Sequence, residues 1–146
     1  MNYRISETED YYPISVLCSE CGLEVEPSKE TPDHNLKMWK CEDEDTGELL
    51  AAAVAGYRNG CYVLEQLAVK KEYRNEHLGE KMLLTAEDGF RRLGADRIWG
   101  CAKVPDYYSQ YGWVRISRSI APDISDCQAC RQFHKTCFPC IIMKEL

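Results

Sequence analysis

The sequence predicts an α/β (α+β) fold in which helices flank one β-sheet. Three strand-like runs follow one another between residues 36 and 69, and the third leads through a short loop into a helix-like run that is followed by a further strand. A chain of 146 residues, of which 45% are hydrophobic, can bury one core of this kind. No repeat, low-complexity tract or linker interrupts it, so we expect a single domain over residues 1–146.

The first 69 residues predict a helix and then a meander of strands. We expect the helix at Tyr11–Leu23, followed by a loop at residues 27–32. Apolar runs bounded by turn residues predict three strands, at Leu36–Cys41, Leu49–Tyr57 and Cys61–Val69. Asn59 and Gly60, between the last two runs, are a pair favoured in two-residue hairpin turns. The strands should therefore pair as neighbours in sequence order.

A phosphate-binding loop is expected between the last strand of this meander and the next helix. The helix is predicted at Leu78–Leu93, because apolar residues recur there at intervals of three and four and Gly94 follows as a stop signal. A loop that leads into a helix presents unpaired N–H groups and the positive end of the helix dipole, which together bind a di- or triphosphate. Arg74 adds a cation to this loop, at residues 69–79.

The same loop resembles that of a known superfamily. Neither Gly-x-x-x-x-Gly-Lys-Ser/Thr nor Gly-x-Gly-x-x-Gly occurs in the sequence. The segment Tyr73–Gly79 is similar to the Arg/Gln-x-x-Gly-x-Gly/Ala pyrophosphate loop of the GNAT superfamily of acetyl-CoA-dependent N-acetyltransferases, with Arg74 and Gly79 matching. His77 stands where the family usually has its middle glycine. Histidine is among the non-glycine residues most often found at positive φ, so the loop can keep its course; the alternative is a weaker hold on the cofactor.

A second segment carries the same resemblance. Asp106–Trp113 is similar to the family signature Phe-Tyr-x-x-x-Gly-Phe, with Tyr108, Gly112 and Trp113 at the matching positions. Further strands are expected at Arg97–Ala102, Trp113–Ser117 and Cys140–Met143. The resulting order, β-α-(loop or α)-β-β-β-α-β-α-β-β, is that of the GNAT fold. The resemblance therefore implies a mixed, mostly antiparallel sheet that is splayed between its fourth and fifth strands, where the cofactor lies.

The resemblance also implies the function and most of the site. Such an enzyme moves an acetyl group from acetyl-CoA directly to a primary amine, here of a small molecule or a peptide. The backbone of Leu67, Ala68 and Val69 is expected to bind the pantetheine arm, because a splayed strand leaves N–H and C=O groups for its amides. The pyrophosphate is expected at Arg74, Asn75, Glu76, His77, Leu78, Gly79 and Glu80. An asparagine that relatives commonly carry before the second segment is replaced by other residues here.

Two catalytic residues are expected, a base for the acceptor amine and an acid for the departing thiolate. The resemblance implies Tyr108 as the acid. Glu65 matches an acidic residue that acts as the base through water in some relatives, and a carboxylate in an otherwise apolar strand is itself a site candidate. The alternative is that Glu65 is a solvated strand residue. Strand alternation predicts that Glu65 and Gln66 face opposite sides of the sheet, so that only one of them faces the acceptor.

Cysteines predict a metal site near the C-terminus, in a cysteine-rich insertion at about residues 118–140. Two Cys-x-x-Cys pairs lie there, Cys127 with Cys130 and Cys137 with Cys140. Their spacing allows four thiolates to converge on one zinc ion. His134 can substitute for one thiolate, and Cys18 with Cys21 can replace one of the pairs. An iron–sulfur cluster and free buried thiols are the alternatives. Nine cysteines without an export signal indicate reduced or metal-bound thiols rather than disulfides.

Charge and composition limit the partners. Residues 1–65 carry 14 acidic and 5 basic side chains and residues 66–146 carry 10 and 13, so the net charge of −6 divides into −9 and +3. An acidic first half suits a cationic amine and a basic second half suits a phosphate-bearing cofactor, unless these charges only solvate turns. We expect no nucleic-acid partner, since no basic stripe occurs, and no membrane partner, since no long apolar run occurs. The chain is expected in the cytoplasm, as a monomer or a homodimer.

A second function remains open on the sequence alone. The chain can instead be a catalytically inactive acyl-CoA-binding domain, or a metal-stapled sensing domain, of the same fold. His77 and the missing asparagine favour this alternative, whereas Tyr108 and the intact frame of residues 73–79 favour the enzyme.

Overall fold

The computed structural model describes residues 2–23, 25–102, 104–117, 119–122, 124 and 140–146. Its elements follow in the order β1 (Tyr3–Thr8), α1 (Tyr11–Glu20), β2 (Asn35–Asp43), β3 (Leu49–Arg58), β4 (Cys61–Val69), the 3₁₀ helix η1 (Lys71–Glu76), α2 (Leu78–Arg92), β5 (Arg97–Ala102), α3 (Pro105–Ser109), β6 (Val114–Ile116) and β7 (Cys140–Glu145). This is the predicted order, with η1 added in the loop after β4.

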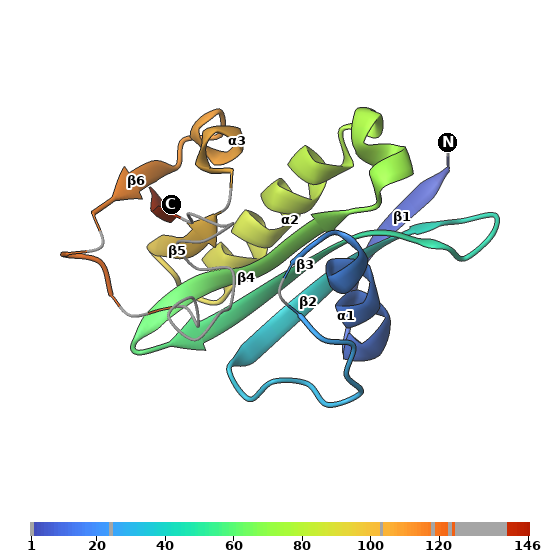
Figure 1. Ribbon diagram of the computed structural model, residues 1–146, viewed down its shortest axis with the longest axis horizontal. Coiled ribbons are helices and arrows are strands. Elements are labelled where there is room, and N and C mark those ends of the chain that lie inside the picture. Colours follow the sequence, from blue (N-terminus) through green and yellow to red (C-terminus); the bar gives the residue numbers. More distant parts are fainter. Residues whose placement is uncertain (1, 24, 103, 118, 123, 125–139) are drawn as a thin grey trace.

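The described residues form one seven-stranded sheet, in the order β1-β2-β3-β4-β5-β7-β6. Neighbouring strands are antiparallel except for β4 and β5, which are parallel. This pair can be parallel because α2 carries the chain back along the sheet before β5 begins. The sheet is therefore mixed and mostly antiparallel, as the sequence predicts (Figure 1).

Helices α1 and α2 cover opposite faces of the sheet, and β3 contributes small residues to both (Figure 1). The odd-numbered residues 51–55 of β3 share a core with α2, whereas Ala52 and Val54 share a core with α1. Gly89 shows how closely α2 lies on the sheet, because a Cβ at this position would overlap the ring of Trp39 in β2. Most of β3 is therefore buried between the two helices.

The fourth and fifth strands diverge, as predicted. β4 pairs with β5 only at Val63 with Trp99 and at Leu64 with Gly100. Beyond these pairs β4 continues to Val69 along β3, while β5 pairs with β7. η1 and the N-terminus of α2 come directly after β4, and α3 comes after β5. The splay between β4 and β5 is therefore bordered by these helices.

Some boundaries differ from the predicted ones. Helix α1 ends at Glu20 and not at Leu23, because Cys21 caps it and Gly22 turns the chain with a φ of 84°. β6 is also shorter than the predicted run at residues 113–117. In the part of the chain that the structure describes, no helix has the length and apolarity needed to cross a membrane.

Candidate active site

A β-bulge at Glu65 marks the point where β4 leaves β5. Val54 of β3 pairs with Gln66, but the next residue, Ala55, pairs with Leu64, so Glu65 is an extra residue in β4. A bulge bends the strand that carries it. The pairing of β4 with β5 ends at Leu64, the residue just before the extra one. The bulge therefore accounts for the splay.

The bulge also puts Glu65 and Gln66 on the same face of the sheet, the face that α1 covers. The Gln66 amide contacts Cys18 Sγ at 3.4 Å and the Tyr11 hydroxyl at 3.3 Å, both from α1. Glu65 packs over Gly56 on the same face of β3, where an added Cβ would lie 2.6 Å from Glu65 Cγ. The prediction that these two side chains face opposite sides is wrong, because the extra residue interrupts the alternation of the strand.

Glu65 is a buried carboxylate that is held by Arg58, and the same guanidinium also bonds to His34. Arg58 Nε lies 3.1 Å from Glu65 Oε1 and 3.0 Å from Oε2, and Arg58 Nη2 lies 2.8 Å from Oε1. His34 Nε2 lies 3.3 Å from the same Oε1 and 2.9 Å from Arg58 Nη2. A guanidinium only donates hydrogen bonds, so His34 Nε2 accepts this one. With 8% of its side chain exposed, Glu65 is not a solvated strand residue.

Two side chains converge on the main-chain carbonyl of Val69, where β4 ends. Cys21 Sγ donates to it at 3.4 Å and Arg74 Nε at 3.3 Å. Of the three residues expected to bind pantetheine, Leu67 and Val69 pack on the α2 side of the sheet and Ala68 packs on the α1 side. Their backbone therefore runs along the splay with its side chains turned to the two cores.

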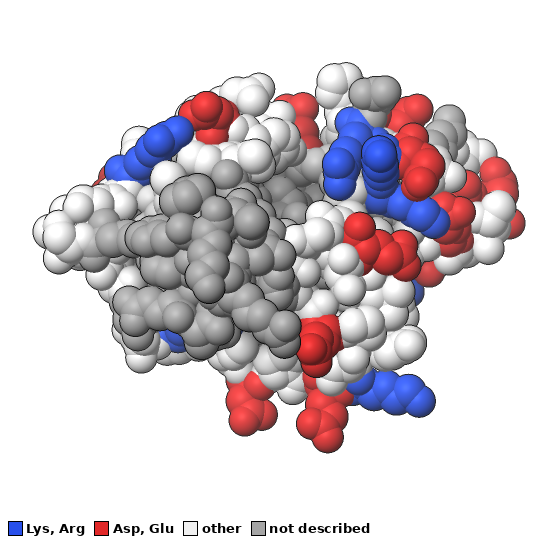
Figure 2. Space-filling model, viewed as in Figure 1, with Lys and Arg blue, Asp and Glu red and all other residues white. Residues whose placement is uncertain are grey.

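The turn after β4 has the geometry of an anion cradle. His77 ends η1 with a φ of 58° and a ψ of 23°, the left-handed conformation expected at the glycine-like position. α2 begins at the next residue without a side-chain cap. Lys81 N–H bonds to the His77 carbonyl at 3.3 Å, so the N–H groups of the first three helical residues precede the helical hydrogen-bond ladder. η1 contains Lys71 and Arg74 beside Glu72 and Glu76, and Figure 2 shows Lys and Arg side chains next to Asp and Glu side chains in this part of the molecule.

Helix α3 and the turn after it bring three tyrosines together on the other side of the splay. The ring of Tyr107 meets those of Tyr108 and Tyr111 edge-on, with centroids 5.3 and 5.4 Å away. Tyr108 also meets the buried ring of Trp113 at 5.6 Å. Burial raises the pKa of Tyr108 to about 12, so its phenol keeps its proton at neutral pH. The hydroxyl of Tyr107 lies against Gly79, at the start of α2.

The predicted metal site falls mostly outside the described residues. This is the case for Cys127, Cys130 and Cys137, whereas Cys140 is the first residue of β7. Cys18 is buried in the core under α1, and burial raises the pKa of its thiol to about 12. Within the described ranges, no group of three or more His, Cys, Asp and Glu side chains could hold a metal ion.

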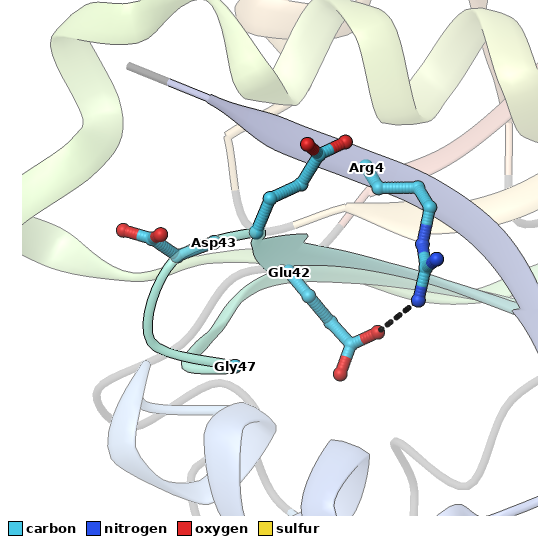
Figure 3. Close-up of a pocket in the computed structure, with 5 residues that line it drawn as sticks. Arg4, Glu42, Asp43 and Gly47 are labelled. Carbon is cyan, nitrogen blue, oxygen red and sulfur yellow. Dashed lines mark ion pairs between the residues drawn. The ribbon is translucent and has the colours of Figure 1, made fainter.

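An open hollow lies elsewhere, at the edge of the sheet formed by β1 and β2 (Figure 3). It is lined by Arg4, Glu42, Asp43, Glu44 and Gly47. Arg4 Nη2 reaches Glu42 Oε1 at 3.8 Å across this hollow. Because β3 separates these two strands from β4, the hollow is not part of the splay.

Reasoning from the sequence missed Arg58, which fixes Glu65, and His34, which bonds to Arg58. Arg58 and His34 belong to other elements, and their approach depends on the bulge. One signal was present, because a glycine inside a strand, here Gly56, often marks a bulge or a close approach. The two expected catalytic residues come from the two sides of the splay, Glu65 from β4 and Tyr108 from α3.

Comparison with known proteins identifies the family of this arrangement. Residues 6–110, from within β1 to just beyond the end of α3, match the model of the acetyltransferase (GNAT) family. No curated protein matches the sequence.

Solved structures share the fold at low sequence identity. An acetyltransferase of the GNAT family from Staphylococcus aureus Mu50 aligns over 99% of both chains, with 18% identity and a TM-score of 0.70. An acetyltransferase from Streptococcus agalactiae 2603 aligns over 99% of this chain and 98% of that chain, with 16% identity and a TM-score of 0.73. The PaiA N-acetyltransferase from Thermoplasma acidophilum, solved with coenzyme A, aligns over 100% of both chains with 16% identity and a TM-score of 0.69. The family model covers more than half of the sequence, and the chain therefore belongs to the GNAT family of acetyltransferases.

Proposed function

We propose that this GNAT enzyme transfers the acetyl group of acetyl-CoA directly to a primary amine of a small molecule or a peptide. The divergence of β4 from β5 beyond Leu64 carries the proposal. It leaves one edge of β4 without a β5 ladder, and the strand ends beside a helix N-terminus that has no side-chain cap. An extended arm with amide groups suits the first feature and a diphosphate suits the second. Acetyl-CoA carries both.

The residues along the splay fit this cosubstrate. The amides of the pantetheine arm would pair with the backbone of residues 67–69, in the place of a neighbouring strand. The diphosphate would lie at residues 74–80, where the first N–H groups of α2 meet the cations of η1. Gly79 adds no side chain at this point. The guanidinium of Arg74 is already at the end of β4, bonded to the Val69 carbonyl.

Tyr108 is proposed as the acid of the reaction. The acceptor nitrogen forms a bond to the acetyl carbon, the C–S bond of the thioester breaks, and the leaving thiolate takes a proton. A neutral phenol can supply that proton, and Tyr108 is neutral because burial raises its pKa to about 12. The proton taken from the acceptor amine returns to Tyr108 through solvent, which balances the cycle.

Glu65 is proposed as the base, acting through a water molecule. Its carboxylate lies on the α1 face at the start of the splay, where α1 and the chain that follows it flank the strand. In the hydrogen bonds among the described residues, Oε2 accepts only from Arg58 Nε. A carboxylate oxygen has two lone pairs, so Oε2 can also accept from a water that carries the proton of the amine.

Two measurements test this function. Acetyl-CoA should raise the thermal midpoint of the protein by mass action, and Gly79→Glu should abolish the rise by placing a carboxylate against the diphosphate. Gly79→Gln is the matched control, because it brings the same overlap with the Tyr107 hydroxyl without the negative charge. Release of free CoA thiol with a panel of amines then identifies the acceptor. The proposal is wrong if acetyl-CoA does not raise the thermal midpoint. A rise in the midpoint without turnover of any amine would indicate the inactive acyl-CoA-binding domain instead.

We also propose one structural zinc ion, held by Cys127, Cys130, Cys137 and Cys140. The spacing of the two Cys-x-x-Cys pairs supports it, since four thiolates bind zinc tetrahedrally. Elemental analysis of the purified protein tests this proposal directly.

A further inference from the structure

Gly79 and Tyr107 make a close contact across the mouth of the splay. A Cβ at Gly79 would lie 2.5 Å from the Tyr107 hydroxyl oxygen, 3.5 Å from Tyr107 Cζ and 3.6 Å from Val69 Cγ2. Gly79 lies in the first turn of α2 and is not among the residues with positive φ, so its backbone does not require glycine. The position needs glycine for space, and the atom that takes the space is the phenol oxygen of Tyr107.

The contact joins the two sides of the splay. Tyr107 belongs to α3, which follows β5, and Gly79 belongs to α2, which follows β4. The edge contacts of Tyr107 with Tyr108 and Tyr111, at 5.3 and 5.4 Å, hold its ring in this orientation. The hydroxyl is thereby fixed at the same turn of α2 that presents the first N–H groups of the helix.

The phenol of Tyr107 is suited to donate a hydrogen bond at this place. Burial raises its pKa, and the charges of Tyr111, Tyr108 and Glu80 together with a hydrogen bond to Tyr111 add to the rise; the single phenol proton would turn from Tyr111 to the ligand on binding. The hydroxyl therefore stays neutral at neutral pH, and it does not bring a negative charge to a site for an anion. A neutral O–H donor beside a phosphate oxygen forms a charge-assisted hydrogen bond.

We propose that Tyr107 is a binding residue for the diphosphate of acetyl-CoA, with its hydroxyl donating to a phosphate oxygen beside Gly79. The inference rests on the proposed function, because it presumes that acetyl-CoA binds at the start of α2. It assigns separate tasks to two adjacent tyrosines. Tyr107 holds the phosphate end of the cosubstrate, and Tyr108, which packs on Trp113, serves the thioester end.

Calorimetric titration of CoA and acetyl-CoA tests the hydrogen bond. Tyr107→Phe should raise the Kd of both ligands by the same factor, about tenfold, because it removes one bond to a charged acceptor that the two ligands share. Tyr57→Phe is the matched control, since its ring is 46% exposed at the end of β3. If the wild type binds acetyl-CoA and Tyr107→Phe binds it equally well, the inference is overturned and the proposed function stands. If the wild type does not bind acetyl-CoA, both fall.

A double-mutant cycle on the thermal midpoint tests the space argument without any ligand. Gly79→Ala should lower the midpoint, because its Cβ meets the phenol oxygen. The same change made in Tyr107→Phe should lower it far less, since the nearest ring atom would then be Cζ at the ordinary contact distance of 3.5 Å. Equal losses in the two backgrounds would show that Tyr107 is not the reason for the glycine.

Discussion

Arg58 donates from one nitrogen, Nε, to both carboxylate oxygens of Glu65, at 3.1 and 3.0 Å, and adds a third bond from Nη2 at 2.8 Å. The two residues face each other across the β3–β4 hairpin, seven positions apart in the sequence. A planar guanidinium fixes the orientation of a carboxylate as well as compensating its charge. Arg58 therefore explains how a carboxylate is tolerated in an apolar strand with only 8% of its side chain exposed.

Removal of the positive charge of Arg58 should destabilise the fold. Arg58→Gln leaves the buried Glu65 carboxylate uncompensated, and the free energy of unfolding in urea should fall by about 3 kcal/mol. Arg115→Gln is the control, because Arg115 pairs with Asp106 at the surface, where the two side chains are 57% and 92% exposed. That change should cost less than about 1 kcal/mol. Similar small losses in both variants would mean that Glu65 does not depend on Arg58.

The pH dependence of turnover should show whether Glu65 acts as the base. Glu65→Gln should lower kcat/KM at neutral pH, where the acceptor amine is mostly protonated and must lose a proton before attack. The defect should shrink as pH rises toward about 10, the range in which lysine-like amines become neutral without a base. The pH profiles of the variant and the wild type provide the measurement. A defect of constant size at every pH would remove Glu65 from the proton transfer.

The proposed acid should affect the rate far more than binding. Tyr108→Phe should lower kcat about 100-fold with little change in the Kd of acetyl-CoA, because a proton donor acts mainly in the transition state. The protonated phenol is the active form, and burial raises its pKa to about 12. Deprotonation of Tyr108 should therefore not lower the activity until the pH approaches that value. Tyr12→Phe, at a 43% exposed site on α1, should leave kcat unchanged. Full activity of Tyr108→Phe would assign the acid role to another group.

The left-handed conformation of His77 predicts the effects of two substitutions. His77→Gly relieves about 1 kcal/mol of backbone strain but adds a similar amount of freedom to the unfolded chain, so stability should hardly change. His77→Ala keeps a Cβ and should gain nothing from either effect. Acetyl-CoA affinity, measured by titration, should be kept or improved in His77→Gly. A large loss of affinity there would instead indicate a direct contact between the imidazole and the ligand.

Zinc content tests the C-terminal cysteine pairs. Protein purified without added metal should contain about one zinc ion per chain, as expected for four converging thiolates. Chelation should weaken use of the acceptor amine while leaving acetyl-CoA binding nearly intact. If the protein contains no metal and the double variant Cys127→Ser with Cys130→Ser keeps its stability and turnover, the cysteines serve another purpose.

Local patterns were sufficient to predict the order of the elements. β4 and β5 occur at the predicted residues, because continuous apolar runs between turn residues define their ends. The connection between β4 and α2 could be predicted because a strand, a loop with Arg74 and a helix of clear periodicity follow one another in the sequence. Even the positive φ of His77 could be expected from its place in that loop. These features depend on residues that are close together in the sequence.

Contacts between distant segments could not be predicted in this way. The bulge at Glu65 changes the register of β4 on β3, and periodicity alone assumes an uninterrupted strand. The approach of Arg58 and His34 to Glu65 depends on that change. The contact of Tyr107 with Gly79 depends on how far β4 and β5 diverge, which no local pattern encodes. The chemical types of the site residues were thus accessible from the sequence, and their mutual geometry was not.

The bulge in β4 amounts to one residue inserted into an otherwise continuous ladder. Leu64 faces the α2 core and Gln66 faces α1, so they would already alternate correctly if Glu65 were deleted. The deletion would join the two halves of the β3–β4 ladder in register and turn over no neighbouring side chain. A single inserted residue therefore distinguishes an uninterrupted β3–β4 ladder from a strand that turns away from β5 and carries a carboxylate at the bend.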